Sequence, residues 1–169
     1  AEKLGRSPKA IKNKCANLGL CKRLRREYFE EFFSSWCSEM AYILGFIMAD
    51  GSITYKGYCK TNSYAVRINL QLRDKCILDY IKSEVQTKAN VNIRKWTGND
   101  NIYREQCRLV ISSKQLVDKL ISLGVVPRKT GKEVFPCMPV EFEYDFIRGY
   151  FDGDGCVGIY SKTYSTSLQ

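Results

Sequence analysis

The sequence predicts an α+β fold in which an antiparallel sheet packs against helices, and three patterns predict it. Residues 65–73 alternate between apolar and polar side chains, as a strand does when one face is buried. Residues 74–86 repeat apolar side chains at helical spacing, and so do Leu116, Leu120 and Leu123 before Gly124. Residues 41–51 and 145–155 share one layout, an apolar helix with a central glycine that ends in Asp-Gly. From residue 38, the expected order is therefore αββαββα.

Composition narrows the possible chemistry. The 169 residues are 44% hydrophobic, which is enough for a buried core. We see no apolar run long enough to span a membrane and no signal peptide, so we expect a cytoplasmic or organellar-matrix protein that is not secreted, with its eight cysteines reduced and mostly buried. The absence of histidine excludes Ser-His-Asp triads, Cys-His dyads and Cys/His zinc fingers. Any catalysis must then depend on carboxylates, lysine or a bound metal.

Positive charge is concentrated at the N-terminus. Residues 1–26 contain nine Lys and Arg against one Glu, so they carry +8 of the net charge of +9. The remaining residues carry 18 basic and 17 acidic side chains. This asymmetry favours a polyanionic partner, most often nucleic acid, over a merely solvated basic tail.

Residues 1–20 have the pattern of a helix-turn-helix. Ser7 can cap the second helix with Pro8 at its first position, and apolar residues then recur at helical spacing. The stretch resembles small helix-turn-helix modules that accompany nucleases of phages and mobile elements. Candidates for DNA contact lie on the exposed side of the second helix: Lys9, Lys12, Asn13 and Lys14.

Small residues form a stripe on each of the two related helices. In the first helix, Ala41, Gly45 and Ala49 lie at positions i, i+4 and i+8, and the second has Gly149 and Gly153 at i and i+4. We expect the helices to pack through these stripes with their backbones in close contact.

Asp50 and Asp154 would then meet at the end of the helix pair, each beside a glycine suited to a left-handed helix cap. A single Asp-Gly after a helix is most often an ordinary cap, but two matching copies favour a functional pair. Carboxylates forced together repel each other, so divalent cations between them would make sense of the arrangement. The pattern points to a two-metal phosphodiester hydrolase.

Residues 43–51 and 147–155 resemble the two signatures of the LAGLIDADG homing endonucleases. The resemblance implies that family's fold, with one αββαββα repeat and an incomplete second one. It also implies a site-specific endonuclease that cuts double-stranded DNA with Mg²⁺ or another divalent cation. In that family the last Asp of each signature, here Asp50 and Asp154, is the metal ligand. Asp152 matches an acidic position of the signature that is not a metal ligand.

The segment 124–139 resembles the family's connector into the second signature. In that connector a lysine lies near the scissile phosphate, so the resemblance makes Lys129 a candidate for transition-state charge stabilisation or water positioning. By the same alignment, Gln71 and Lys75 belong to the solvent network around the metals.

One face of the expected sheet is polar. The inward positions are Val91, Ile93, Cys107, Leu109 and Ile111 together with the apolar residues of 65–73. Arg, Asn and Gln can form two hydrogen bonds to a base edge in the major groove. For any one of these residues, a solvated sheet face is an equally common explanation. In the family this face reads DNA. The candidates are Arg67, Asn69, Gln71, Arg73, Asn92, Arg94, Gln106 and Arg108.

The predicted organisation has four parts: a basic helix-turn-helix and the start of a linker in 1–26, linker in 27–37, a first repeat in 38–140 and the start of a second repeat in 141–169. Only 15 residues follow Asp154, so we expect a fragment that does not cleave by itself. The full-length protein should act on double-stranded DNA as a monomer, with no membrane partner. The alternative is a non-cleaving nucleic-acid binder, an intron RNA maturase or a DNA-binding regulator, but retention of both aspartates favours the enzyme.

Overall fold

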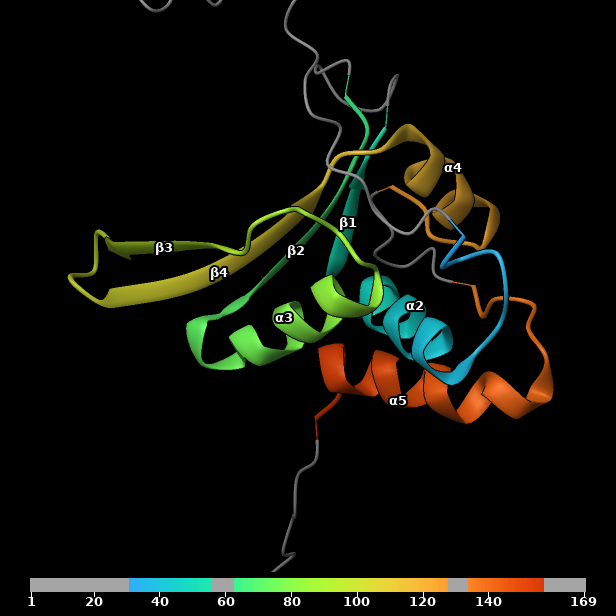
Figure 1. Cartoon of the computed structure of the whole chain (residues 1–169). Helices are drawn as coiled ribbons and strands as arrows, with labels where there is room; N and C mark the ends of the chain where they lie inside the picture. The colour runs from blue at the N-terminus through green and yellow to red at the C-terminus, as the bar shows by residue number, and fades with distance from the viewer. Residues whose placement is uncertain (1–30, 56–62, 128–133, 157–169) are drawn as a thin grey trace, which may run out of the picture.

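The computed structural model describes residues 31–55, 63–127 and 134–156 (Figure 1). The helices are α2 (Ser38–Asp50), α3 (Lys75–Glu84), α4 (Lys114–Ser122) and α5 (Glu143–Asp154), with short 3-10 helices at Leu72–Asp74 and Val140–Phe142. The strands are β1 (Gly51–Thr54), β2 (Ala65–Gln71), β3 (Asn92–Thr97) and β4 (Tyr103–Ile111). They form one antiparallel sheet in the order β1-β2-β4-β3. The predicted αββαββα order is confirmed, and α5 follows it.

The core lies between one face of the sheet and the helices α2, α3 and α4. Helix α2 is apolar nearly all round and is buried from Met40 to Ala49 with Tyr42 partly exposed, as its composition predicts. From the sheet, Ile68 and Leu109 enter this core, and Leu78 and Leu120 meet them from α3 and α4. Figure 1 shows α5 on the side of α2 that faces away from the sheet.

The β3–β4 hairpin extends beyond the helices (Figure 1). Cys107, Leu109 and Ile111 are buried as expected, but Ile93 is 50% exposed and Val91 is only half-buried. The prediction for Ile93 is wrong because strand alternation reports which face a side chain is on, and not whether a helix covers that part of the face.

The segment before α2 is part of the core. Residues 27–37 were expected to be a linker, but from residue 31 on they are described and Phe32 and Phe33 are buried, with their rings edge to face at 4.9 Å. Two adjacent aromatic rings are a poor composition for a solvated linker. The predicted helix-turn-helix, with Lys9, Lys12, Asn13 and Lys14, lies outside the described residues.

The glycines that end α2 and α5 are extended and not left-handed, contrary to the prediction. Gly51 has φ −78° and ψ 156°, and Gly155 has φ −70° and ψ 147°. Close packing explains the glycines instead, since a Cβ at Gly51 would lie 2.5 Å from the carbonyl oxygen of Ile47. A left-handed glycine does follow α4, where Gly124 has φ +96°.

The described cysteines are free, but they are not mostly buried. Cys107 is buried and Cys37 is half-buried, whereas Cys76, Cys137 and Cys156 are exposed. The exposed ones lie at the start of α3 and in the segments that flank α5. Within the described ranges, no helix has the length and apolarity needed to cross a membrane.

Candidate functional site

Helices α2 and α5 pack backbone to backbone through their central glycines. A Cβ at Gly45 would collide with the carbonyl oxygen of Phe146 and lie 2.8 Å from the amide nitrogen of Tyr150. A Cβ at Gly149 would collide with the carbonyl oxygen of Tyr42. Phe146 and Tyr42 each precede the glycine of their own helix by three residues, so the contacts are reciprocal. The predicted small-residue packing is confirmed, and the pair has a local two-fold symmetry.

This symmetry relates residues that lie 104 positions apart, as Asp50 and Asp154 do. Met40, Ile43 and Ile47 of α2 are buried under the sheet. Their counterparts on α5 are exposed large hydrophobic residues: Tyr144, Ile147 and Phe151. The two helices thus share a pattern, but in the described part of the chain only α2 is covered by a sheet.

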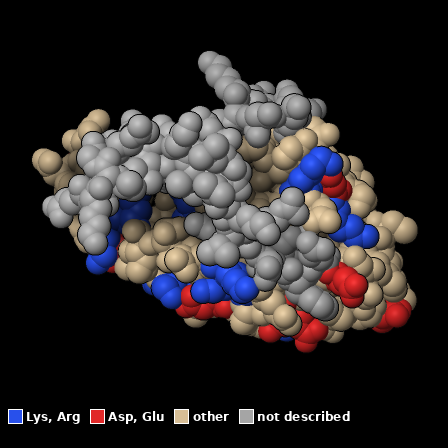
Figure 2. All heavy atoms as spheres, turned by 45° about the horizontal axis from the view of Figure 1, so that its top comes forward, with Lys and Arg blue, Asp and Glu red and all other residues tan. Residues whose placement is uncertain are grey.

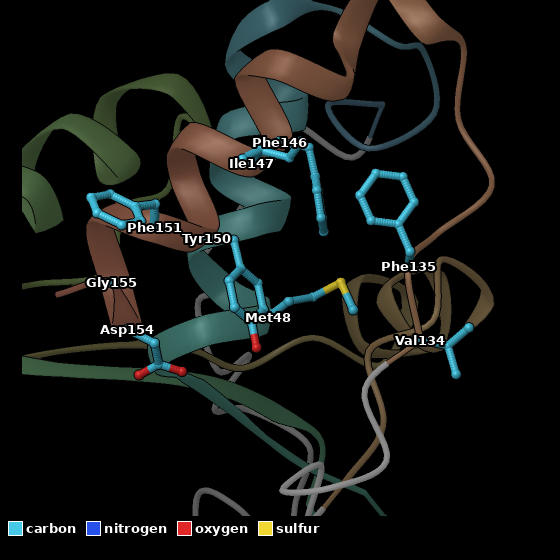
Figure 3. Close-up of a pocket in the computed structure, with 9 residues that line it drawn as sticks. All are labelled: Met48, Val134, Phe135, Phe146, Ile147, Tyr150, Phe151, Asp154 and Gly155. Atoms are coloured by element: carbon cyan, nitrogen blue, oxygen red, sulfur yellow. The ribbon is translucent and has the colours of Figure 1, made fainter. Parts of the chain in front are cut away.

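The ends of the two helices lie side by side. A Cβ at Gly153 would collide with the Cβ of Ala49 and lie 3.5 Å from the amide nitrogen of Asp50. Gly153 immediately precedes Asp154, so the structure brings Asp50 and Asp154 to the same end of the helix pair. Asp50 is half-buried and Asp154 is exposed. Figure 3 shows the Asp154 side chain at the end of α5, next to the end of α2.

The surroundings of Asp154 are largely apolar. Asp154 lines a pocket with Met48, Phe146, Tyr150 and Phe151, and the Phe135 ring lies 5.1 Å from that of Phe146 (Figure 3). Asp154 itself is exposed at the edge of this pocket, so its carboxylate is accessible to a cation.

Asp50 and Asp154 fit a hard divalent cation that takes its remaining ligands from water and a substrate. In the described part of the chain, no three or more His, Cys, Asp or Glu side chains gather into a metal-binding cluster. Two carboxylates are nonetheless sufficient protein ligands for Mg²⁺, which keeps several waters and takes phosphate oxygens as further ligands.

The other predicted catalytic residues lie on elements other than the helix pair or outside the described residues. Gln71 is exposed at the last position of β2. Lys75, at the start of α3, is paired with Asp79 at 2.5 Å. Lys129 lies outside the described residues.

The face of the sheet opposite α2, α3 and α4 presents ordered rows of polar side chains. The strand register aligns Asn69, Arg108 and Asn92 in one row, and Gln71, Gln106 and Arg94 in the next. The Nε of Arg108 donates a hydrogen bond to Oδ1 of Asn69 at 2.5 Å.

Asp50 leads directly into the sheet, because strand β1 begins at Gly51, which pairs with Ile68 of β2. On the polar face, Arg67 donates to the hydroxyl of Thr54.

Arg73 does not belong to this face. Strand β2 ends at Gln71, and Arg73 lies in the 3-10 helix that follows, with its Nε 3.6 Å from Oδ2 of Asp74. The alternating pattern continued to residue 73, but the chain turns there because Asp74 and Lys75 begin the next helix.

Sequence reasoning missed several residues of the polar face and the hairpin. Trp96 follows Arg94 by two residues, on the same side of β3, and the Arg94 guanidinium lies 5.1 Å from the centre of its ring. At the hairpin turn, Nη1 and Nη2 of Arg104 donate hydrogen bonds to Oδ1 and Oδ2 of Asp100, at 2.8 Å and 2.5 Å. The alternation of 92–97 could have indicated Trp96, whereas the Asp100 contact depends on a turn that no pattern predicts.

Charge on the visible surface is mixed. In Figure 2 the Lys and Arg side chains lie next to Asp and Glu side chains and do not form one continuous basic patch. This agrees with the near balance of charge beyond residue 26.

Similar folds occur among solved structures. The homing endonuclease I-WcaI, bound to its DNA recognition sequence, matches with a TM-score of 0.50 and 11% identity over 84% of this chain. The chain has the α+β fold of this homing endonuclease. The I-LtrWI LAGLIDADG homing endonuclease bound to target DNA also matches, at a TM-score of 0.36 and 13% identity over 73% of this chain.

The chain spans 62% of the I-WcaI chain and 58% of the I-LtrWI chain. No protein-family model and no curated protein matches the sequence. Identity this low shows a shared fold and not a shared activity, so the function must be argued from the site itself.

Proposed function

We propose that this chain carries the catalytic aspartates and the DNA-reading sheet of a site-specific double-strand DNA endonuclease. One observation carries the proposal: Asp50 and Asp154 share one end of the helix pair, and Asp50 leads directly into a sheet that has rows of Arg, Asn and Gln on one face. A cleavage centre next to a base-reading surface is what a site-specific nuclease needs.

Asp50 and Asp154 would hold Mg²⁺ or another divalent cation. Bound there, the metal supplies a nucleophilic hydroxide at neutral pH and neutralises charge on the leaving oxygen. The chain itself contributes two carboxylates from two helices whose separation is set by backbone contact. Lys129, Gln71 and Lys75 are proposed to position water and stabilise charge around the scissile phosphate.

The sheet face would read the target. Arg94 and Arg108 are exposed and can each present two donors to guanine, and Asn69, Asn92, Gln71 and Gln106 can bond to adenine. The basic residues 1–26 would add affinity through phosphate contacts that do not depend on base sequence.

Cleavage of a supercoiled plasmid tests the proposal directly. The intact gene product, incubated with Mg²⁺ and a plasmid that contains DNA flanking its gene, should nick and then linearise the plasmid at one site. A plasmid without that DNA should stay supercoiled. Tight binding to the flanking DNA with no cleavage at any Mg²⁺ or Mn²⁺ concentration would contradict the enzyme and leave the DNA-binding regulator, and preferential binding to intron RNA would leave the maturase.

A further inference from the structure

The outer edge of the helix pair holds a cluster of polar and aromatic side chains that the proposed chemistry does not use. The Tyr42 hydroxyl of α2 donates a hydrogen bond to Oδ2 of Asp152 on α5 at 2.9 Å. The Arg148 guanidinium lies 4.9 Å from the centre of the Tyr42 ring, and the Tyr80 ring of α3 meets that ring edge-on at 6.0 Å. These four residues line one small polar hollow.

The cluster exists on only one side of the two-fold pair. The symmetry that relates Gly45 to Gly149 also relates Tyr42 to Phe146 and Asp152 to Met48. Phe146 and Met48 line the apolar pocket beside Asp154. The same two geometric positions therefore hold a hydrogen-bonded pair on one side and two apolar side chains on the other, so the hydrogen bond is not a requirement of the helix packing itself.

Asp152 and Asp154 are directed to different sides of α5. Asp152 lines the polar hollow with Tyr42, whereas Asp154 lines the apolar pocket. The last turn of α5 between them is closed by a hydrogen bond from the Gly155 amide to the Phe151 carbonyl at 2.7 Å. Asp152 lies inside this turn, so a bond that holds Asp152 to α2 also restrains the turn that carries Asp154.

We propose that Tyr42 and Asp152 are positioning residues: their hydrogen bond holds the last turn of α5, and with it Asp154, in place against the end of α2. The inference rests on the proposed function in one respect, because the importance of placing Asp154 follows from its proposed role as a metal ligand. Arg148 and Tyr80 support the bond by fixing the plane of the Tyr42 ring from its face and its edge. Burial, and then the bond to Asp152, raise the pKa of Tyr42 to about 12, so its hydroxyl keeps its proton at any physiological pH.

Amide hydrogen exchange of the 169-residue chain tests the hydrogen bond without any metal. In Tyr42→Phe, the amides of the last turn of α5 should exchange about fivefold faster, which corresponds to one hydrogen bond, while those of α3 stay unchanged. Tyr80→Phe removes a hydroxyl from the neighbouring ring and should exchange like the wild type. Asp152→Ala should behave like Tyr42→Phe. Asp152→Asn keeps an acceptor oxygen and should restore most of the protection.

Terbium luminescence then tests the link to Asp154. The wild-type chain should bind Tb³⁺, and Asp154→Asn should abolish this binding. Tyr42→Phe should weaken it severalfold and Tyr80→Phe should not, while the urea midpoints of these two variants stay equal. Unchanged exchange in Tyr42→Phe would overturn the inference, and so would unchanged Tb³⁺ affinity in that variant. If Tyr42→Phe shows the faster exchange but the wild-type chain binds no Tb³⁺, the proposed metal site is refuted. The restraint of the turn by the hydrogen bond is then still established.

Discussion

Gly45 and Gly149 each lie against the backbone of the other's helix, Gly45 at the carbonyl of Phe146 and Gly149 at the carbonyl of Tyr42. Because neither carries a side chain, the separation of α2 and α5 is set by main-chain atoms, which move less than side chains do. The separation of Asp50 and Asp154, at the ends of these helices, depends on the same contact.

Gly149→Ala should destabilise the protein. In a helix interior this change normally stabilises by about 1 kcal/mol. Here the new Cβ would collide with backbone of α2, so a loss of about 1 to 3 kcal/mol or more is expected. Gly45→Leu should act in the same direction and more strongly. Urea unfolding measures both, with exposed Gln115→Ala in α4 as the control. A more stable Gly149→Ala variant would show that the helices are not in contact there.

Asp50→Asn in the intact gene product should abolish DNA cleavage and leave DNA binding nearly unchanged, because the carboxylate is proposed to hold a metal and not to contact bases. Plasmid cleavage and a gel-shift titration measure the two properties. Asp118→Asn, which removes a carboxylate that pairs with Lys114 on α4, should cleave normally. Wild-type cleavage by Asp50→Asn would refute the assignment of Asp50 as a metal ligand.

Deletion of residues 1–26 should weaken DNA binding mainly through electrostatics. The segment carries +8, and if about half of its basic side chains contact phosphates, the slope of log K against log salt should fall by roughly 4. Site preference should survive because the sheet remains. If the slope stayed the same and the preferred site were lost, the N-terminal segment would be the reader.

Arg108→Ala should reduce discrimination between the target and point-mutated targets by about 1 to 3 kcal/mol at the base pair that Arg108 reads. The same change also frees Oδ1 of Asn69 from its hydrogen bond. Lys119→Ala, on α4, serves as the control for loss of one positive charge. Competition binding against a panel of single-base target variants measures this discrimination. Equal loss of affinity for every target would instead show that Arg108 contacts phosphates and not bases.

The hairpin turn should keep its ion pair to unusually low pH. Hydrogen bonds from Arg104, and then from the Ile102 amide, lower the pKa of Asp100 to about 2 from the usual 3.8. A lowered pKa means that the carboxylate stabilises the folded turn above about pH 3.8, and that this stabilisation is lost as the pH falls towards 2. In NMR titrations the Ile102 amide should therefore shift near pH 2, and at a higher pH in Arg104→Ala. The same midpoint in both proteins would mean that the pair does not form.

Sequence patterns alone predicted the order of elements, the stripe of small residues on α2 and α5, and the alternation that separates core from polar side chains in 65–71. Each is a local regularity: the 3.6-residue and two-residue periods say which face a side chain occupies. Two matching copies of helix and Asp-Gly were also enough to predict that Asp50 and Asp154 lie at the same end of the helix pair, because a repeat constrains geometry in a way that a single motif cannot.

What lies over each face depends on tertiary packing. The exposure of Ile93 and the burial of Phe32 and Phe33 depend on neighbours that are distant in sequence. The bond between Tyr42 and Asp152 is the clearest case, since 110 residues separate them. Local periods carry no information about such pairs, because the packing of one helix on another determines which side chains meet.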